Sequence, residues 1–522
     1  MIEIFNNKIF VSEDDPSCLP LKIDLTFNFS GNRKIYKKLK NGKTRIKNHH
    51  YSNTQVLYSQ QKNGINIPRG LYSLLSSRYF NNSNIIDKQI SELNDISNLN
   101  MNELMKFNSV LDGITLTPEQ MIAIRKMILV KRCILQLATG SGKTEIMCGF
   151  VKIIENILGY IPTTIILEPT VYLVNSTVQR MRKYNIPCTS YRDTREIIEN
   201  SVNICHPSSL NNDIKKNPEI TSLVKILMGD ECHHLQSDMY RNPLKLFDNI
   251  EYCIGLSASA ISQEHVNCNN LKDFYVNELE MIGATGPLVM SLNADHFIEN
   301  GTLATPVLLM MHNNADEFIP DEQIQNWHKI VEDVLCSDLR NRTVCSTAEF
   351  FSKRKRKVLI LVHTIKWSRM LLEIFDEYGM SDQVRASYGG GRYEKYSSGE
   401  FIDCDENVKE QFGNGEISIL IGTSHLYEGA DIPNLDVIIL AFGGRKERMQ
   451  IQGIGRALRR TKTGKYAYLV DFTDQDNVVL RKQSNERLER YKEVIKIPDK
   501  MRFYDVEVSN LNQIFDDLEE FI

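Results

Sequence analysis

Short apolar runs alternate with amphipathic segments from Thr117 onward. The run Cys133–Leu137 is followed by a helical pattern that begins at Lys143, and Thr164–Leu167 is followed by another over Val174–Tyr184. Two further apolar runs of the same kind are Val224–Met228 and Tyr252–Leu256. This repeated strand–helix order predicts a parallel sheet covered by helices.

The same order begins again after the basic run Lys353–Lys357. Such a run is more often a solvated entry to a strand than a nucleic-acid contact. Val358–Val362 then leads into a helical pattern over Lys366–Tyr378. Later apolar runs are Ser418–Ile421, Val437–Leu440 and Tyr466–Val470. We therefore predict an α/β protein with two parallel-sheet domains in tandem.

The two ends of the chain have a different pattern. Residues 1–110 are polar and rich in Asn, with a short apolar alternation over Lys22–Phe29, which predicts a small α+β module. After Asn477 comes a charged helical pattern and then the acidic end FDDLEEFI. The predicted domains are 1–110, 111–315, 316–476 and a helical tail, 477–522.

Composition sets limits on the class of protein. With 522 residues the chain is long enough for about three domains, and 42% apolar with 25% charged residues is ordinary for a folded protein. No run of 18 apolar residues predicts a membrane span, and the start has no signal-peptide pattern. The eleven cysteines include no CxxC pair, which argues against a zinc ribbon. Their scattered positions indicate a reduced compartment. We therefore expect the protein in the cytoplasm, and in the host cell cytoplasm if the chain is viral.

The net charge of −4 does not suggest a binder of polyanions, so nucleic acid would have to meet a local basic surface. One such stretch is Arg33–Lys47, RKIYKKLKNGKTRIK, with eight Lys or Arg and no acid. It is either a solvated hairpin or loop, or a surface that contacts phosphates. In the second case the contacting residues are Arg33, Lys34, Lys37, Lys38 and Lys40.

The most specific local motif is ATGSGKTE, Ala138–Glu145, between an apolar strand and a helix. Its two glycines, Gly140 and Gly142, let the backbone turn tightly so that N–H groups face a phosphate chain at the start of the helix. Lys143 would reach the β- and γ-phosphates, and the Thr144 hydroxyl would bind Mg²⁺. Leu137 stands where the strict P-loop pattern has Gly. The predicted ATP-binding residues of this loop are Thr139, Gly140, Ser141, Gly142, Lys143 and Thr144.

An acidic pair, Asp230 and Glu231, ends the apolar run VKILMG. Two carboxylates at the C-terminal end of a strand lie at the edge where α/β sheets bind ligands. Asp230 suits a water-mediated contact with Mg²⁺, and Glu231 suits the polarisation of an attacking water. Alone, such a pair is often only a helix cap, but after a phosphate-binding loop it indicates nucleotide hydrolysis.

Two weaker motifs gain meaning from this context. TPEQ, ending at Gln120, is by itself a helix start, but an amide at this place could bind the adenine edge. In the form QxxGRxxR, Gln452, Arg456 and Arg459 would share one helix face at i, i+4 and i+7. Two guanidinium groups there suit a γ-phosphate; the alternative is a basic surface helix.

Taken together, the chain resembles superfamily-2 helicases and translocases over roughly Thr117 to Phe472. The family motifs occur in order: the Gln120 element, ATGSGKT, EPTVYLV, CHPSSL, DECH, SAS, LVHT, GTSHLYEGADIP and QxxGRxxR. The resemblance implies two RecA-like domains that clamp ATP and carry nucleic acid on the opposite edge. It also implies backbone contacts by Thr170, Ser209 and Thr423, a place near the nucleotide for Gly429 and Asp431, and coupling of the two sites by Ser257 and Ser259.

The polymer is suggested by less specific segments. The motif DECH followed by His234 is closer to DEAH-like groups than to DEAD-type RNA helicases. Two further segments resemble phage UvsW-type branch-migration helicases: IGATGPLVMSL (Ile282–Leu292) and LRKQSNERLERY (Leu480–Tyr491). In that group an N-terminal module engages duplex DNA, a role that Arg33–Lys47 and IPRG (Ile67–Gly70) would suit here. The resemblance thus implies an ATP- and Mg²⁺-dependent helicase that acts as a monomer on branched, forked or duplex DNA.

Three other functions stay open. An RNA helicase would share the same motor motifs. A restriction-type translocase subunit would need a nuclease, and no PD…ExK-like cluster occurs in the flanks. A binding scaffold with a decayed ATPase would have lost Lys143, Glu231 or an arginine of QxxGRxxR, and all are present.

Overall fold

The computed structural model describes residues 1–38, 44–81, 83–89, 93, 99–236, 244, 246–247, 249–268, 270–313, 336–388, 392–404, 408–423, 435–442, 466–474, 478–494 and 502–506. They form two compact units, which are described separately. Unit 1 comprises Met1–Leu137 and Lys143–Ser291, and unit 2 comprises Ala138–Gly142 and Leu292–Ile522.

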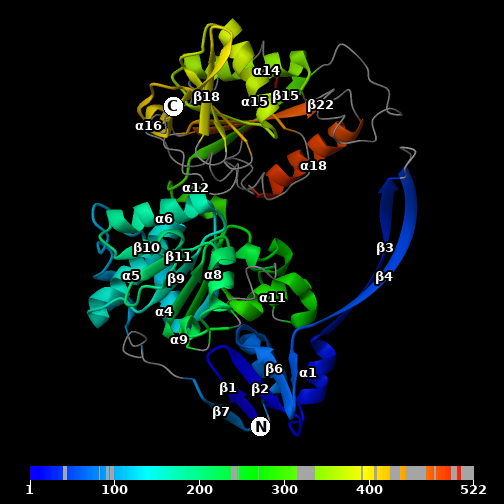
Figure 1. Ribbon diagram of the computed structural model, residues 1–522, viewed down its shortest axis with the longest axis vertical. Helices are drawn as coiled ribbons and strands as arrows, with labels where there is room; N and C mark the ends of the chain where they lie inside the picture. Colours follow the sequence, from blue (N-terminus) through cyan, green and yellow to red (C-terminus); the bar gives the residue numbers. More distant parts are fainter. Residues whose placement is uncertain are drawn as a thin grey trace. The chain divides into compact units, whose positions relative to one another are not determined.

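Unit 1 begins with a small α+β module (Figure 1). Its five-stranded sheet has the order β5-β6-β2-β1-β7. The strands are β1 Ile2–Ile4, β2 Lys8–Ser12, β5 Ser59–Gln61, β6 Gly64–Pro68 and β7 Ile85–Asp87. The helices are α1 Cys18–Asp24, the 3₁₀ turn η1 Arg69–Leu71, and α2 Tyr72–Tyr79. The predicted alternation over Lys22–Phe29 is thus partly helical, because Cys18, Leu21 and Leu25 are buried at helical spacing.

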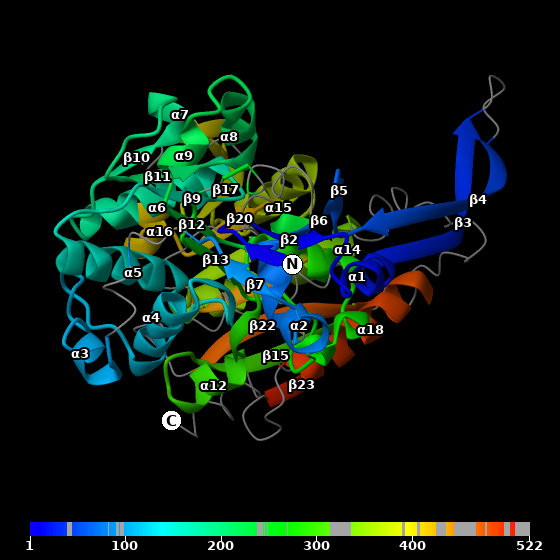
Figure 2. The same cartoon turned by 90° about the horizontal axis from the view of Figure 1, so that it is seen from below.

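A long antiparallel hairpin leaves this module as a ribbon (Figure 2). Its strands are β3 Thr26–Lys38 and β4 Thr44–Val56, which pair with each other and with no other described strand. The basic stretch Arg33–Lys47 therefore occupies the distal part of a hairpin, with residues 39–43 outside the described range.

The larger part of unit 1 is a seven-stranded sheet in the order β10-β11-β9-β12-β13-β8-β14. The pairs from β10 to β8 are all parallel. The strands are β8 Arg132–Leu137, β9 Thr164–Leu167, β10 Cys188–Ser190, β11 Val202–Cys205, β12 Ile226–Gly229, β13 Tyr252–Ser257 and β14 Leu288–Leu292. The helices are α3 Met101–Met105, α4 Pro118–Val130, α5 Lys143–Leu158, α6 Val171–Lys183, α7 Tyr191–Thr194, α8 Pro207–Ile214, α9 Ile220–Leu223 and α11 Val276–Ala284.

One hydrophobic core joins the module to this sheet. Buried side chains of the module, such as Leu71 and Leu75, belong to the same cluster as Leu279 and Ile282 of α11. The backbone at Gly70 approaches α11 so closely that a Cβ there would lie 1.9 Å from the carbonyl oxygen of Ile282. The segment IPRG therefore packs directly on α11.

Unit 2 is built on a nine-stranded sheet in the order β19-β18-β17-β20-β16-β21-β22-β15-β23. The hairpin β18–β19 is antiparallel to β17, and the other pairs are parallel. The strands are β15 Thr305–Asn313, β16 Val358–Leu361, β17 Val384–Tyr388, β18 Arg392–Ser397, β19 Glu400–Cys404, β20 Ile419–Gly422, β21 Val437–Leu440, β22 Tyr466–Asp474 and β23 Arg502–Val506. The helices are α12 Ala294–Glu299, α14 Asp338–Lys353, α15 Ile365–Glu377, α16 Val408–Asn414 and α18 Val478–Val494.

The fold is that of two RecA-like parallel-sheet domains preceded by a small α+β domain, as predicted. The predicted domain limits stay predictions, and the strands add two details to them. Thr305–Asn313 pairs with β22 and so belongs to the second sheet, and the predicted helical tail also contains β23, which pairs with β15. No helix among the described residues is long and apolar enough to cross a membrane.

Candidate active site

Four neighbouring strands of unit 1 end at the same edge of the sheet. In the order β9-β12-β13-β8 they are parallel, so their C-terminal ends lie side by side. Glu168 follows β9, Asp230 and Glu231 follow β12, Ser257 ends β13, and the ATGSGKT loop follows β8. Residues that are far apart in the sequence are thereby gathered into one polar edge.

The loop after β8 has the backbone that its glycines allow. Gly140 and Gly142 have φ values of 87° and 82°, which side chains disfavour. The N–H of Ser141 donates to the carbonyl of Ala138 at 3.2 Å, and α5 starts at Lys143. The Thr139 Oγ1 atom is buried and has no hydrogen-bond partner among the described residues. A turn of this kind at the start of a 16-residue helix is built to accept an anion.

Lys143 is 9% exposed, and its Nζ donates to the carbonyl of Leu137 at 3.4 Å. Its charge acts on both carboxylates of the acidic pair. For Asp230, burial and the neighbouring Glu231 outweigh Lys143 and raise the pKa to about 6. For Glu231, burial raises the pKa, but Lys143 and the contacts with His233 and Ser257 outweigh it and lower the pKa to about 2. Both carboxylates are therefore mostly ionised at neutral pH, and as the pH falls Asp230 takes up a proton before Glu231 does.

The position of Glu231 is fixed by its backbone and by two side chains. Its φ of 45° is left-handed, which is uncommon for a residue other than glycine and is often found at functional sites. The Ser257 hydroxyl donates to Glu231 Oε2 at 3.2 Å, and His233 Nδ1 lies 3.3 Å from the same oxygen. His233 Nδ1 is also 2.9 Å from Ser257 Oγ, and both side chains are buried. Ser257 Oγ in turn accepts the N–H of Ser259 at 3.2 Å.

Glu168 and His233 were not predicted as site residues. Glu168 is fully buried and accepts a hydrogen bond from the Thr177 hydroxyl at 2.6 Å. Burial and the nearby Asp230 raise the pKa of Glu168 well above its ordinary value. The available signal was an acid placed directly after an apolar strand, TIILE, as in the Asp230 motif. Nothing in the sequence showed that His233 would turn toward Ser257.

The predicted site residues outside this group have other contacts. Gln120 and Thr117 form a capping box at the start of α4, in which Gln120 Oε1 accepts the N–H of Thr117 at 2.9 Å. Thr170 caps α6 through the N–H of Leu173. Ser209 lies in α8, and Thr423 is buried after β20. Their roles toward adenine and nucleic acid stay predictions.

Several predicted site residues lie outside the part that the structure describes. They are Lys40, Gly429, Asp431, Gln452, Arg456 and Arg459. For Arg33, Lys34, Lys37 and Lys38 the structure describes the strand but not the side chains.

Two protein families match the chain. Residues 113–261 match the family "Type III restriction enzyme, res subunit", and residues 340–461 match "Helicase conserved C-terminal domain". These ranges fall on the larger sheet of unit 1 and on the sheet of unit 2.

Several similar proteins are named as helicases or translocases. The chain is 23% identical to "DNA 3'-5' translocase XPB2" of Sulfurisphaera tokodaii over 74% of this chain and 88% of that protein. It is 21% identical to "ATP-dependent DNA helicase uvsW" of Enterobacteria phage T4, over 75% of this chain and 76% of that protein. Among solved structures, the helicase MrfA bound to DNA matches with a TM-score of 0.54 at 15% identity, covering 80% of this chain and 56% of that chain. Dbp5 of S. cerevisiae bound to RNA and ADP BeF3 matches with a TM-score of 0.51 at 14% identity, covering 79% and 98%. These two likenesses show the fold.

Proposed function

Because the chain is a superfamily-2 helicase of the UvsW-like kind, an ATP-hydrolysing motor on nucleic acid, we propose that it is of the DExH type and acts on branched or forked duplex DNA. The observation that carries the proposal is the gathering of Lys143, Asp230 and Glu231 at one sheet edge, in a chain that also bears a basic hairpin. The first feature supplies ATP hydrolysis, and the second supplies a surface for a duplex.

The residues at the sheet edge fit a nucleotide with Mg²⁺. The left-handed glycines, the Lys143 ammonium and the Thr139 hydroxyl, which has no partner among the described residues, would form a cradle for phosphates together with Ser141 and Thr144. Thr144 and Asp230 would hold Mg²⁺, whose charge offsets the negative charge on the phosphates. Gln120 would bind the adenine edge, and Gly429 and Asp431 of the second domain would lie near the nucleotide.

Glu231 is the proposed base. An ionised carboxylate held by Ser257 and His233 can accept a proton from the water that attacks the γ-phosphate. Arg456 and Arg459, with Gln452 on the same face, would stabilise negative charge from the second domain. Ser257 links Glu231 to the Ser259 backbone, and we propose that the SAS segment transmits a change at the base through these bonds.

Binding of the polymer is proposed for residues that follow the C-terminal ends of β9, β11 and β20. Thr170, Ser209 and Thr423 would contact the sugar–phosphate backbone, so the motor would have little sequence preference and a strong salt dependence. The β3–β4 hairpin would contact the duplex through Arg33, Lys34, Lys37, Lys38 and Lys40. We propose a monomer as the active form on DNA.

The test is steady-state ATPase activity with Mg²⁺ and five polymer conditions: none, single-stranded DNA, duplex DNA, a four-way junction and structured RNA. The proposal expects the strongest stimulation by forked or four-way DNA. Stimulation by RNA alone would overturn the DNA assignment, and no turnover with any polymer would return the scaffold function to consideration.

A restriction-type translocase subunit is the second candidate, favoured by the family that matches residues 113–261. Such a motor would be stimulated by linear duplex as strongly as by a junction. Equal stimulation by these two substrates, with translocation but no junction processing, would favour this candidate.

A further inference from the structure

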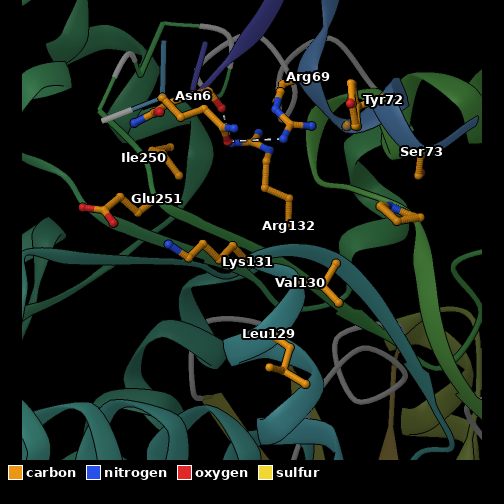
Figure 3. Close-up of a pocket in the computed structure, with 13 residues that line it drawn as sticks. Asn6, Arg69, Tyr72, Ser73, Leu129, Val130, Lys131, Arg132, Ile250 and Glu251 are labelled. Carbon is orange, nitrogen blue, oxygen red and sulfur yellow. Dashed lines mark hydrogen bonds between the residues drawn. The ribbon is translucent and has the colours of Figure 1, made fainter. Parts of the chain in front are cut away.

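Two arginines of unit 1 meet in a cavity that is separate from the ATP site. The cavity of about 310 Å³ lies where the N-terminal module packs on the larger sheet (Figure 3). Arg69 of η1 and Arg132, the first residue of β8, direct their guanidinium groups toward each other at one end of it. A single water needs roughly 10–15 Å³ by the same measure, so a polyatomic ion has ample room.

Both guanidinium groups have an unused donor. The Nε atoms of Arg69 and Arg132 are buried and without a hydrogen-bond partner in the part of the chain that the structure describes. Arg132 uses its Nη atoms to donate to the carbonyls of Asn6 at 2.8 Å and Ala284 at 3.0 Å. Arg69 donates from Nη2 to Gln89 Oε1 at 3.2 Å and lies over the ring of Tyr72. Each group is therefore held in place while one N–H still lacks an acceptor.

No described carboxylate forms an ion pair with either arginine. Glu251 lines the same cavity, but its Oε2 accepts the N–H of Leu93 at 3.2 Å, and Asp87 accepts the amide groups of Gln89. Burial, together with the charge of Arg132, lowers the pKa of Arg69 to about 10. Two half-buried like charges close together are unfavourable without an anion, so both guanidinium groups attract an anion that enters the cavity.

We propose that Arg69 and Arg132 form a phosphate-binding site at the junction of the N-terminal module and the first RecA-like domain. Guanidinium groups match the oxygens of a phosphate and are weakly hydrated, which favours this anion over chloride. The phosphate is either a phosphodiester of a bound nucleic acid or a free phosphate. Arg132 begins the strand that leads to the ATGSGKT loop, so the site connects the module with the strand that carries the ATP site.

The alternative is that the pair only fastens the module to the sheet. Arg132 does so through Asn6 and Ala284, and for this reason the test changes Arg69 instead. The matched control is Arg78→Gln on α2, which removes the same charge from the same module but from an exposed ion pair with Asp24. All variants in the first assay also carry Lys143→Ala. This change weakens phosphate binding at the ATP site, so that the thermal response reports on the arginine site alone.

The first assay compares melting temperatures of the full-length protein in sodium phosphate and in sodium chloride at equal ionic strength. We expect a saturable rise with phosphate for K143A and for R78Q/K143A, and its loss for R69Q/K143A. Arg69→Lys keeps the charge but loses the forked donor geometry of the guanidinium group, so it should give a smaller rise in melting temperature with phosphate. This variant also serves as the test if R69Q does not fold.

The second assay measures the affinity of otherwise wild-type protein for a labelled forked DNA at several salt concentrations. Removal of one phosphate contact in R69Q should lower the slope of log K against log salt by about 0.9, while R78Q leaves it unchanged. A lower slope assigns the site to the nucleic-acid backbone, and loss of the thermal response alone assigns it to free phosphate. An unchanged thermal response together with an unchanged slope would overturn the site. If the protein binds no forked DNA, the proposed function fails, and the thermal assay still decides the phosphate site.

Discussion

At the scale of the residue, burial and neighbouring groups give similar side chains different states. The pKa of Glu231 is lowered because Lys143, His233 and Ser257 stabilise its charge, whereas the pKa of Glu168 is raised because it is fully buried beside Asp230. Three acids at one sheet edge thus have separate properties that their residue type alone does not indicate.

Replacement of Glu231 by Gln removes the proposed base and keeps the size of the side chain. We expect ATP to bind with unchanged affinity while turnover falls by two or more orders of magnitude, roughly the contribution of a general base. Nucleotide binding and ATPase activity should be measured side by side, with Glu199→Gln, an exposed acid, as the control. Wild-type turnover in E231Q would remove this residue from the mechanism.

Asp15 of the N-terminal module makes stability depend on pH. Burial raises its pKa, but hydrogen bonds from Ser17, the ion pair with the Met1 ammonium at 2.9 Å and a hydrogen bond from Ser83 outweigh it and lower the pKa from 3.8 to about 2. Because the folded pKa is the lower one, Asp15 stabilises the fold above about pH 4, and this contribution is lost as the pH falls toward 2.

Melting temperatures between pH 5 and 2, taken for wild type, Asp15→Asn and Asp14→Asn, test this expectation. D15N should melt at lower temperature near neutral pH and show a shallower fall in acid, while the exposed Asp14 serves as the control. Parallel pH curves for D15N and wild type would contradict the assignment.

At the scale of the element, local sequence sets where helices begin, and distant contacts hold them in place. Thr117, Thr170 and Thr364 each cap a helix with a side-chain hydrogen bond. A Thr directly before a helical pattern already indicates such a cap in the sequence. Helix α18, in contrast, is tied to β22 by Arg487, which forms two hydrogen bonds to Asp471.

The Arg487–Asp471 pair is buried, with side-chain exposures of 1% and 0%, and Tyr491 also donates to Asp471 at 2.7 Å. Arg487→Ala leaves the Asp471 charge without its partner, which costs about 3–5 kcal/mol. Thermal unfolding of the second unit should shift down strongly. Lys482→Ala, an exposed position on the same helix, should have no effect, and equal melting of the two variants would contradict the role of the pair.

The β3–β4 hairpin carries the basic stretch away from the rest of the module. Neutralising Lys37, Lys38 and Lys40 to Gln should weaken duplex binding and lower the slope of its salt dependence by about 2–3, since each phosphate that is no longer bound lowers it by about 0.9. The control triple variant of Lys62, Lys215 and Lys216 removes the same charge from exposed positions elsewhere. Equal affinities for the two triple variants would leave the hairpin as a solvated element.

At the scale of the whole molecule, the N-terminal module reaches the motor through the packing of IPRG on α11. A methyl group at Gly70 would lie 1.9 Å from the Ile282 carbonyl, and Pro68 packs against Gly283. Gly70→Ala therefore forces the backbones apart, at a cost typical of overpacking, about 1–3 kcal/mol.

We expect G70A to keep its ATPase activity without polymer and to lose part of the stimulation by forked DNA, because the module is displaced from the first domain. ATPase assays with and without forked DNA measure both quantities, and Ser77→Ala on α2 is the control. If forked DNA stimulates the ATPase activity of G70A as fully as that of wild type, and the melting temperature is unchanged, then the contact between Gly70 and α11 does not couple the module to ATP hydrolysis.

The sequence by itself determined the class of the fold and the identity of the motor. Apolar runs followed by helical patterns predicted both parallel sheets, because strand burial and helix amphipathicity are encoded locally. The ATGSGKT loop and Asp230–Glu231 were readable for the same reason, since each needs its residue types in one short segment.

Only the tertiary structure decided which of these residues act on one another. The turn of His233 toward Ser257, the raised pKa of Glu168 and the meeting of Arg69 with Arg132 depend on contacts between residues far apart in the chain. The same holds for β15 and β23, whose place in the second sheet follows from strand pairing rather than from local pattern. Such contacts depend on burial and electrostatics in three dimensions, which sequence spacing does not encode.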